Sequence, residues 1–346
     1  MFATTLALIA QCYQGRARGI AFGIRGTAAG IAVVLGPVVG GVLVSALSWR
    51  WVFWVNLPVA AVTAVIGWRR LPHAVRPHRG RRPDIGGPVL LAAGLTLLIF
   101  ALLRGEDDGW ASASVVAMLA GSATALTAFL LAERHHPDPM LDTRLFRDPS
   151  FTGTQAGSFT VQASIFALLI YLSLFFQDHL HYSALRTGLC FLLLVAPILL
   201  AGPAAGAVLD RLPRRYLAAG ALAVLTAGIA LMYGLTPRST WTHLAAGLIV
   251  AGLACGTALP VLGSLAVDIA DPQHLGMAAG INNTMLQVGS ATGIAVYGAI
   301  LGPAAATSPS LASGLNRLFV IAAIVAACGA VLTFTLIRTA PQARAG

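Results

Sequence analysis

Ten long apolar segments follow one another along this chain, and this succession constrains the fold more than any other feature of the sequence. A helix needs about 20 apolar residues to cross the hydrocarbon core of a bilayer. Lipid offers the backbone no hydrogen-bond partners, so each such run must form a helix that satisfies its own backbone groups. We therefore predict an all-α integral membrane protein with ten full transmembrane helices, at residues 20–47, 51–68, 88–103, 111–131, 157–176, 187–209, 216–235, 241–267, 276–301 and 318–337.

Residues 1–12 form a shorter apolar run that precedes these ten segments. At 1.5 Å per residue it reaches only about 18 Å, so we interpret it as a partial first helix. We do not expect it to be a signal peptide, because no basic region precedes it. The composition agrees with a membrane protein, since 57% of the residues are hydrophobic and 10% are charged, whereas a soluble domain carries about 25% charged residues.

The arginines between the apolar segments predict how the helices are oriented. All 22 basic residues are arginine, and sixteen of them fall on one side when successive loops are assigned to alternate sides. The other side receives only Arg50, Arg104, Arg186, Arg238 and Arg317. Because basic loops stay in the cytoplasm, we expect a multi-pass protein of the cell inner (plasma) membrane with its C-terminus in the cytoplasm.

The net charge of +10 does not indicate a nucleic-acid-binding protein. The arginines are dispersed between apolar runs and do not form a basic stripe with interleaved aromatic residues. The lipid bilayer is the large partner that this pattern predicts, and we expect no contact with nucleic acid.

The stretch from residue 30 to residue 58 carries the most specific local pattern. Its apolar run contains glycines four residues apart, which lie on one helix face and let a neighbouring helix approach closely. A proline in the same run removes a backbone donor and bends the helix. A corner with Trp and Arg follows at residues 48–51, as expected at a membrane–water interface. Taken alone, the glycine spacing also fits any close-packed helix hairpin.

In order, GPVVGG followed by SWRWVFWVNLP resembles the fifth and sixth spans of the major facilitator superfamily, in its fourteen-span drug:proton antiporter (multidrug efflux) branch. In that family the Gly-Pro element belongs to the antiporter motif of the fifth span. The match here falls on Gly30, Gly36, Pro37, Gly40 and Gly41. Stretches at 171–188, 202–215 and 274–301 also match this branch.

The resemblance implies a major facilitator fold, N-terminally truncated in this chain by three to four spans. It divides the chain into three regions. Residues 1–70 would be a remnant of the N-terminal six-helix half. Residues 71–150 would hold a basic linker, two extra inserted helices and a second cytoplasmic loop, and residues 151–346 would form the C-terminal six-helix half.

Three charged residues stand at a predicted cytoplasmic helix end, namely Asp210, Arg211 and Arg215. An aspartate there can pair with arginine and with the N-terminus of a neighbouring helix. The stretch GPAAGAVLDRLPRR resembles the second-half copy of the family's cytoplasmic loop motif, which implies a gating loop that holds the two halves closed on the inside. The alternative is a solvated charge cluster that only sets the topology.

Two helices each carry a polar stripe on one face. Gln155, Ser158 and Gln162 follow at i, i+3 and i+7 on one helix, and the stretch at 276–301 places Asn283, Gln287 and Ser290 at i, i+4 and i+7. Polar side chains in hydrocarbon must find partners, so the stripes either form interhelical hydrogen bonds or line a wet cavity. In the family, helices at these positions line the central cavity, so the resemblance favours these six residues as part of the lining of a substrate cavity.

The twelve acidic residues all fall in predicted loops or at predicted helix ends. Proton coupling needs an ionisable group inside the membrane, and no carboxylate stands in the middle of a predicted span. Protons as the coupling ion are therefore implied by the resemblance alone. Arg25 lies about one turn inside its segment, and we expect it to reach back to the cytoplasmic surface.

The sequence predicts no cofactor and no metal site. The four cysteines lie in or beside apolar runs without a CxxC pair, which favours membrane packing. The run of Asp178, His179 and His181 falls in a predicted external turn at residues 177–182, and His135 and His136 form a second loop pair. A metal there is the less favoured alternative.

These observations predict a secondary active transporter that exports small hydrophobic, drug-like or natural-product molecules by proton antiport with alternating access. One alternative is a truncated inactive remnant, or an assembly partner, of such a transporter. A second is a solute importer on the same scaffold, against which the Gly-Pro element weighs. An enzyme is not expected, because the spans hold no catalytic constellation of acid, His or Ser.

Overall fold

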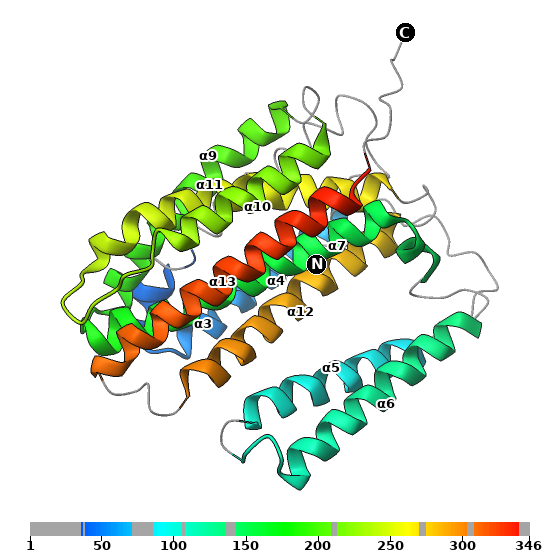
Figure 1. Cartoon of the computed structure of the whole chain (residues 1–346), viewed down its shortest axis with the longest axis horizontal. Coiled ribbons are helices and arrows are strands. Elements are labelled where there is room, and N and C mark those ends of the chain that lie inside the picture. The colour runs from blue at the N-terminus through cyan, green and yellow to red at the C-terminus, as the bar shows by residue number, and fades with distance from the viewer. Residues whose placement is uncertain are drawn as a thin grey trace.

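The computed structural model describes residues 36, 39–70, 86–105, 108–135, 143–208, 213–269, 275–302 and 308–338. Within these ranges the chain is all helical, with no β-strand. The expected all-α class is therefore confirmed for this part of the chain. Figure 1 shows a long helical bundle in its C-terminal part, with a separate helix pair running alongside it.

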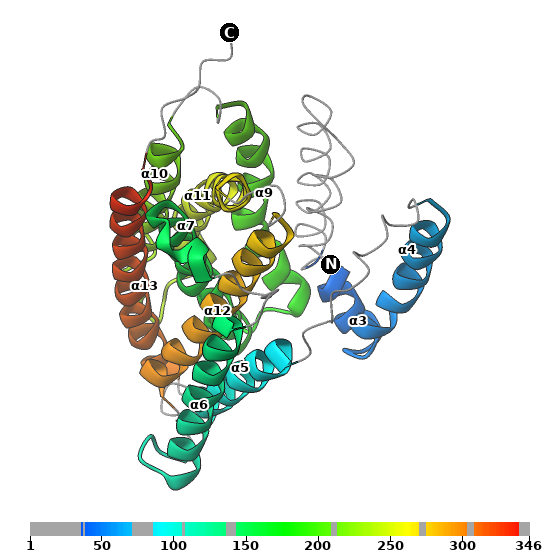
Figure 2. The same cartoon turned by 90° about the vertical axis from the view of Figure 1, so that its right-hand side faces the viewer.

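The first described segments lead into a short pair of helices. A helical stretch at 39–46 is followed by α3 (Trp51–Trp54) and α4 (Asn56–Arg70), which are separated only by Val55. Together they form a candidate span, and its most apolar stretch is not buried by the rest of the protein. Figure 2 shows α3 and α4 standing apart from the bundle. Most of their exposed side chains are apolar, although Asn56, Thr63 and Arg69 are exposed as well, and such a surface suits a hydrocarbon environment.

The next two helices, α5 (Gly86–Arg104) and α6 (Ala113–His135), form a hairpin beside the bundle. Small residues let them approach closely, because the side chain of Leu126 occupies the space that a Cβ on Gly94 would need. Ser122 Oγ donates a hydrogen bond of 2.8 Å to the carbonyl of Gly94 in the same contact. Hydrogen bonds and small residues of this kind are typical of helix association in membranes.

The C-terminal bundle begins with one long helix that changes its winding twice. It comprises α7 (Pro149–Val161), the π-helical turn η2 (Gln162–Phe166), α8 (Ala167–Leu174) and the π-helical turn η3 (Phe175–His179). A short 3-10 helix, η1 (Thr143–Arg147), precedes it, and Asp148 caps it by accepting a hydrogen bond of 2.7 Å from the Ser150 amide. Each π-turn inserts one extra residue and so rotates the helix faces that follow it.

Five further helices complete the bundle: α9 (Ala184–Val208), α10 (Arg214–Ala230), α11 (Trp241–Asp268), α12 (Leu275–Leu301) and α13 (Ser308–Leu336). Helix α11 packs between α9 and α10, and α10 also packs on α13. Helix α7 lies in the middle and contacts α11, α12 and α13. The hairpin touches the bundle through α5, which lies against α12.

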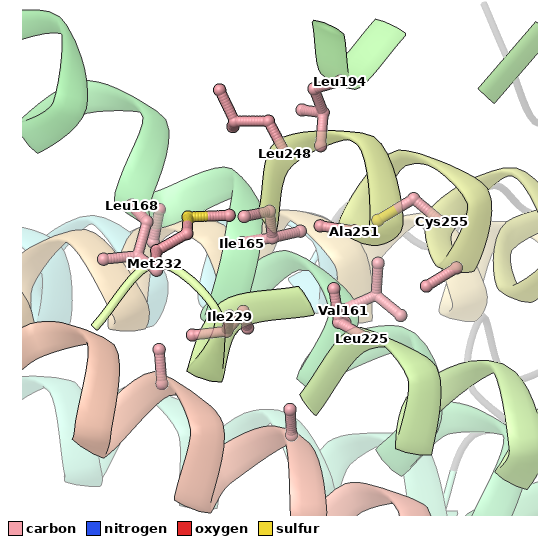
Figure 3. Close-up of a cluster of buried hydrophobic side chains, with 14 of the residues drawn as sticks. Val161, Ile165, Leu168, Leu194, Leu225, Ile229, Met232, Leu248, Ala251 and Cys255 are labelled. Carbon is pink, nitrogen blue, oxygen red and sulfur yellow. The ribbon is translucent and has the colours of Figure 1, made fainter. Parts of the chain in front are cut away.

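Figure 3 shows the part of the bundle core where the long helix, α9, α10 and α11 meet, which is formed mainly by aliphatic side chains together with Met232 and Cys255. The labelled buried residues are Val161, Ile165, Leu168, Leu194, Leu225, Ile229, Met232, Leu248, Ala251 and Cys255. Helices α9 and α11 approach so closely that a Cβ on Gly256 would lie 2.7 Å from the carbonyl oxygen of Ile198. Only glycine fits there without moving a backbone, so this residue sets the spacing of the two helices.

Seven helices in the described ranges are long and apolar enough to cross a membrane, at Trp51–Arg69, Ala113–Arg134, Pro149–His179, Ala184–Gly202, Trp241–Asp268, Leu275–Leu301 and Leu311–Leu336. The apolar helix at Gly86–Ala101 is shorter, and α10 has 17 residues. The predicted count of ten full spans plus a partial one is thus not confirmed. The partial helix and most of the segment at 20–47 lie outside the described residues.

Several predicted ends are wrong. The segment predicted at 216–235 ends as a helix at Ala230, and the residues after it form a turn. The segment predicted at 318–337 begins ten residues earlier, at Ser308, because the helix continues past its apolar part through Asn316 and Arg317. The external turn predicted at 177–182 is helical as far as His179, where η3 ends.

Candidate functional site

The polar stripe of α7 is buried against its neighbours. Gln155 is 2% exposed and Ser158 is 1% exposed. Ser158 Oγ donates a hydrogen bond of 2.7 Å to Asn282 Oδ1 on α12. Asn282 is not among the predicted site residues, because the i, i+4, i+7 spacing selects its neighbour Asn283. The pair of adjacent asparagines is the only signal in the sequence that could have found it.

The polar stripe of α12 does not meet the stripe of α7. Asn283 and Gln287 are exposed and Ser290 is half-buried, whereas Gly289 faces the backbone of Phe159 on α7. Successive residues of a helix turn by about 100°, so the face that carries Asn283 lies roughly a quarter turn from the packed one. The two predicted stripes therefore do not form one surface. One is packed inside the bundle and the other lies open beside it.

A carboxamide in the packed stripe has no partner within the described part of the chain. Neither Nε2 nor Oε1 of Gln155 makes a hydrogen bond, although both atoms are buried, and Gln162 Oε1 is also buried and unpaired. An unsatisfied buried polar group costs about 1–3 kcal/mol of stability. Such groups in a folded protein call for a reason. A ligand or a helix movement that brings them a partner would supply one.

Two tyrosines bind the π-turn to α12. Tyr297 donates a hydrogen bond of 3.3 Å to the carbonyl of Ser164, which lies in η2, and Tyr171 donates one of 2.5 Å to the carbonyl of Ile294. Their rings meet edge to face with centroids 6.2 Å apart. Gly293 lies in the same seam, the contact between α12 and the long helix, where an added Cβ would meet the backbone of Ala163. These contacts fix the register of α12 on the long helix.

The predicted antiporter motif is described only in part. Gly30 and Pro37 lie outside the described residues. A Cβ added to Gly36 or Gly40 would meet no described atom within 4 Å, whereas a Cβ on Gly41 would lie 2.7 Å from Cα of Leu185 on α9. Among the described residues, the close approach predicted for the face of Gly36 and Gly40 is not found there; it occurs at the adjacent Gly41, where the segment meets the start of α9.

The predicted gating loop is likewise incomplete, since Asp210 and Arg211 lie outside the described residues. The guanidinium of Arg215 stacks over the ring of Phe334 on α13, 4.0 Å from its centroid. Its neighbour Arg214 forms an ion pair with Asp268 at the end of α11. Sequence reasoning missed Asp268 as a partner, because 54 residues separate the two and no motif links them.

The predicted histidine-rich turn has a structural role at the other end of the bundle. His179 Nε2 lies 2.9 Å from the carbonyl oxygen of Pro237, and its ring stacks on Phe175 with centroids 5.0 Å apart. Within the described ranges, no group of three or more His, Cys, Asp or Glu residues is arranged to hold a metal ion.

Similarity to known proteins extends over most of this chain. The profile of the Major Facilitator Superfamily matches residues 1–294 and, in a second match, residues 154–346. The puromycin resistance protein pur8 of Streptomyces alboniger is 35% identical over 292 residues, which cover 82% of this chain and 57% of that protein. The multidrug resistance protein Stp of Mycobacterium tuberculosis is 30% identical over 321 residues, covering 91% of this chain and 58% of its own length.

The probable actinorhodin transporter of Streptomyces coelicolor is 32% identical over 311 residues, covering 85% of this chain and 53% of its length. The chain thus spans a little over half the length of these curated relatives. The profile match covers most of the sequence, and the described helices agree with a multi-pass membrane protein. This chain belongs to the Major Facilitator Superfamily.

Proposed function

We propose that this chain works as a drug-exporting secondary transporter, which moves small hydrophobic molecules by proton antiport with alternating access. Its relatives are named for resistance to puromycin, to several drugs or to methylenomycin, and one for actinorhodin transport. Alternating access in this kind of fold is a rocking of two helical halves about a central site. Residues 151–346 would form the C-terminal half, 71–150 the inserted pair with its loops, and 1–70 part of the first half.

The open polar face of α12 is the observation that carries this proposal. Asn283 and Gln287 are exposed on a mainly apolar helix that is long enough to cross the membrane. Exposed amides are unfavourable against lipid, so this face borders a second set of helices or a hydrated cavity. A cavity with a few amides among apolar walls suits a hydrophobic ligand that accepts or donates a few hydrogen bonds.

We propose a supporting role in the site for the α7 stripe of Gln155, Ser158 and Gln162. Ser158 lies against α12 in this structure, and the unpaired atoms of Gln155 and Gln162 would gain partners if a ligand or a helix movement brought a polar group to them. Ser158 already binds Asn282. We therefore assign direct substrate contact first to Asn283, Gln287 and Ser290, and a supporting role to the α7 stripe.

The gate is proposed at the end of the bundle that holds Arg214 and Arg215. The Arg214–Asp268 pair joins the start of α10 to the end of α11, and the loop with Asp210 and Arg211 leads directly into α10. On the positive-inside rule this end is cytoplasmic, as is the C-terminus. The variant Asp210→Asn is expected to lower transport without lowering membrane insertion, because the charge is needed for the latch and not for the helices.

Proton coupling is proposed from the resemblance of the whole chain to drug:proton antiporters. Within the described spans, the acidic residues stand at or near helix ends: Glu133 in α6, Asp178 in η3 and Asp268 in α11. A carrier of protons across the membrane needs an ionisable group whose proton affinity changes with the conformation. We therefore expect that group outside the described spans.

Efflux of a hydrophobic cationic dye from an efflux-deficient host tests the proposal. Cells that express the 346-residue chain, and a form extended by any in-frame upstream coding sequence, are compared with and without a protonophore. The double variant Asn283→Ala/Gln287→Ala should retain more dye than the wild type at equal membrane expression. Gln177→Ala, an exposed amide bonded to Ser173 at the bundle end, serves as the matched control. Unchanged efflux in the double variant would contradict the assigned site, and efflux insensitive to the protonophore would contradict proton coupling.

A further inference from the structure

A groove lies on the outer side of the bundle, where α10 ends, α12 ends and α13 begins. Its volume is about 540 Å³, and its walls include Tyr233, Ile300, Asn316, Arg317, Val320 and Ile321. This volume falls in the range of about 300–1,000 Å³ that is typical of small-molecule sites. The groove lies at the end of the bundle opposite to the Arg214–Asp268 pair, so it is separate from the proposed gate.

The walls of the groove are held in place before anything binds. Asn316 Oδ1 accepts hydrogen bonds from the amides of Gly234 and Leu235 at 3.0 and 2.9 Å, and its Nδ2 donates one of 2.7 Å to the Leu235 carbonyl. His243 Nε2 lies 3.2 Å from the carbonyl oxygen of Tyr233. The turn after α10 is therefore fastened to α13 and to α11. A fixed wall of this kind lowers the entropy that a ligand must lose on binding.

The groove opens onto a face of α13 that suits lipid. Arg317 is exposed on the same helix face as Val320, Ile324 and Val331, which are 44%, 56% and 62% exposed. These residues follow at spacings of three, four and seven, so they form one continuous stripe. Figure 2 shows α13 at the rim of the bundle, with α10 beside it. An exposed apolar stripe on a spanning helix is the surface that acyl chains cover.

Arg317 stands at the depth of the lipid headgroups. From Arg317 to the end of α13 at Leu336 the helix rises by about 29 Å at 1.5 Å per residue, which matches a hydrocarbon thickness of about 30 Å. Within the described part of the chain, Arg317 makes no ion pair. An arginine at this depth is stable when it reaches the phosphate layer, because a charge left in hydrocarbon is strongly disfavoured.

We propose that this groove binds an anionic membrane phospholipid, with the lipid phosphate on the Arg317 guanidinium and an acyl chain against Ile300, Val320 and Ile321. The guanidinium matches a phosphate in charge and can donate two parallel hydrogen bonds to it. Tyr233 lies at the same level, where aromatic side chains favour the headgroup region. A cationic drug does not suit this groove, because it would meet the positive charge of Arg317.

The test is lipid retention by the purified full chain, measured by native mass spectrometry after delipidation and titration with phosphatidylglycerol or phosphatidylcholine. The wild type should bind phosphatidylglycerol at one high-affinity site. Arg317→Gln should weaken this binding about ten- to a hundredfold, the usual effect of losing a hydrogen bond between charged groups. Arg317→Lys should lose less, because it keeps the charge but not the paired donors.

Two matched variants distinguish this site from general attraction between charges. Arg238→Gln removes an exposed arginine from the turn at the same end of the bundle and should leave binding unchanged. Val320→Trp fills the groove from the lipid side and should weaken binding while Arg317 stays in place. The proposal is overturned if Arg238→Gln matches Arg317→Gln, if phosphatidylcholine binds as well as phosphatidylglycerol, or if inorganic phosphate alone competes fully for the site.

Discussion

Replacement of Asn316 by alanine tests how the outer end of the bundle is held together. The side chain makes three hydrogen bonds to the turn after α10, two to amides and one to a carbonyl. Leu235 is only 3% exposed, so its amide and its carbonyl have little access to water once Asn316 is truncated. The amide of Gly234 belongs to an exposed residue and can be hydrated instead.

The expected loss follows from these three bonds. Each intramolecular hydrogen bond contributes about 0.5–1.5 kcal/mol, and a buried group left unpaired costs about 1–3 kcal/mol. Because Leu235 is buried and Gly234 is exposed, we expect a local destabilisation of about 2–4 kcal/mol. This is less than the loss expected if all three hydrogen-bonding groups of the turn were buried. A tenfold change in an equilibrium corresponds to about 1.4 kcal/mol, so opening of the turn should become about 30- to 700-fold more frequent.

Hydrogen exchange of the purified protein, followed by mass spectrometry, measures this opening. Peptides that contain Gly234 and Leu235 should exchange faster in Asn316→Ala, while peptides from the middle of α11 should not change, because the effect is local. Asn283→Ala removes an exposed asparagine from α12 and serves as the control, with no expected change in either region. Equal exchange of the turn in Asn316→Ala and wild type would refute the reasoning, as would equal acceleration throughout the bundle.

Three further variants test the seams of the bundle. Gln155→Leu should raise the melting temperature in detergent and lower dye efflux. The melting temperature should rise because the variant removes a buried amide without hydrogen-bond partners, which costs about 1–3 kcal/mol of stability. A fall in stability would contradict this account. Gly293→Leu should prevent stable folding or strongly lower the melting temperature, since the added side chain meets Ala163; normal stability would show that the seam is looser than described. Asp268→Asn should change stability by less than about 1 kcal/mol, because its pair with Arg214 is half-exposed, yet alter efflux at equal expression; unaltered efflux would remove the pair from the gate.

The helices themselves could be predicted from the sequence because burial of the backbone in lipid leaves no alternative to a helix. The segments predicted at 88–103, 241–267 and 276–301 agree with α5, α11 and α12 to within two residues. The ends of α10 and α13 could not be predicted in this way. Hydropathy indicates which residues lie within the hydrocarbon core of the membrane, whereas a helix ends where its backbone hydrogen bonds end. Arg317, for example, is charged but still lies within the helix α13.

The polar stripes show a second limit of the sequence. The period of 3.6 residues correctly groups Asn283, Gln287 and Ser290 on one face, but it does not say what that face meets. The packed face of α12 is decided by Gly289 and Gly293, which fit against the backbone of the long helix. Gly293 meets the long helix at Ala163 in the π-turn η2, and no pattern in the sequence indicates the extra residue of this turn.

The seam between the long helix and α12 limits which movement can open the site. Ser158 binds Asn282 on one side of η2, Tyr297 binds the carbonyl of Ser164 in η2, and Tyr171 binds α12 beyond it. A rotation of α12 within the bundle would break all three contacts and drive Gly293 against its neighbour. The other side of α12 makes no comparable bonds within the described part of the chain, since Asn283 and Gln287 are exposed there. In the proposed transport cycle α12 and the long helix therefore move together, and substrate access changes where the open face of α12 meets the other half.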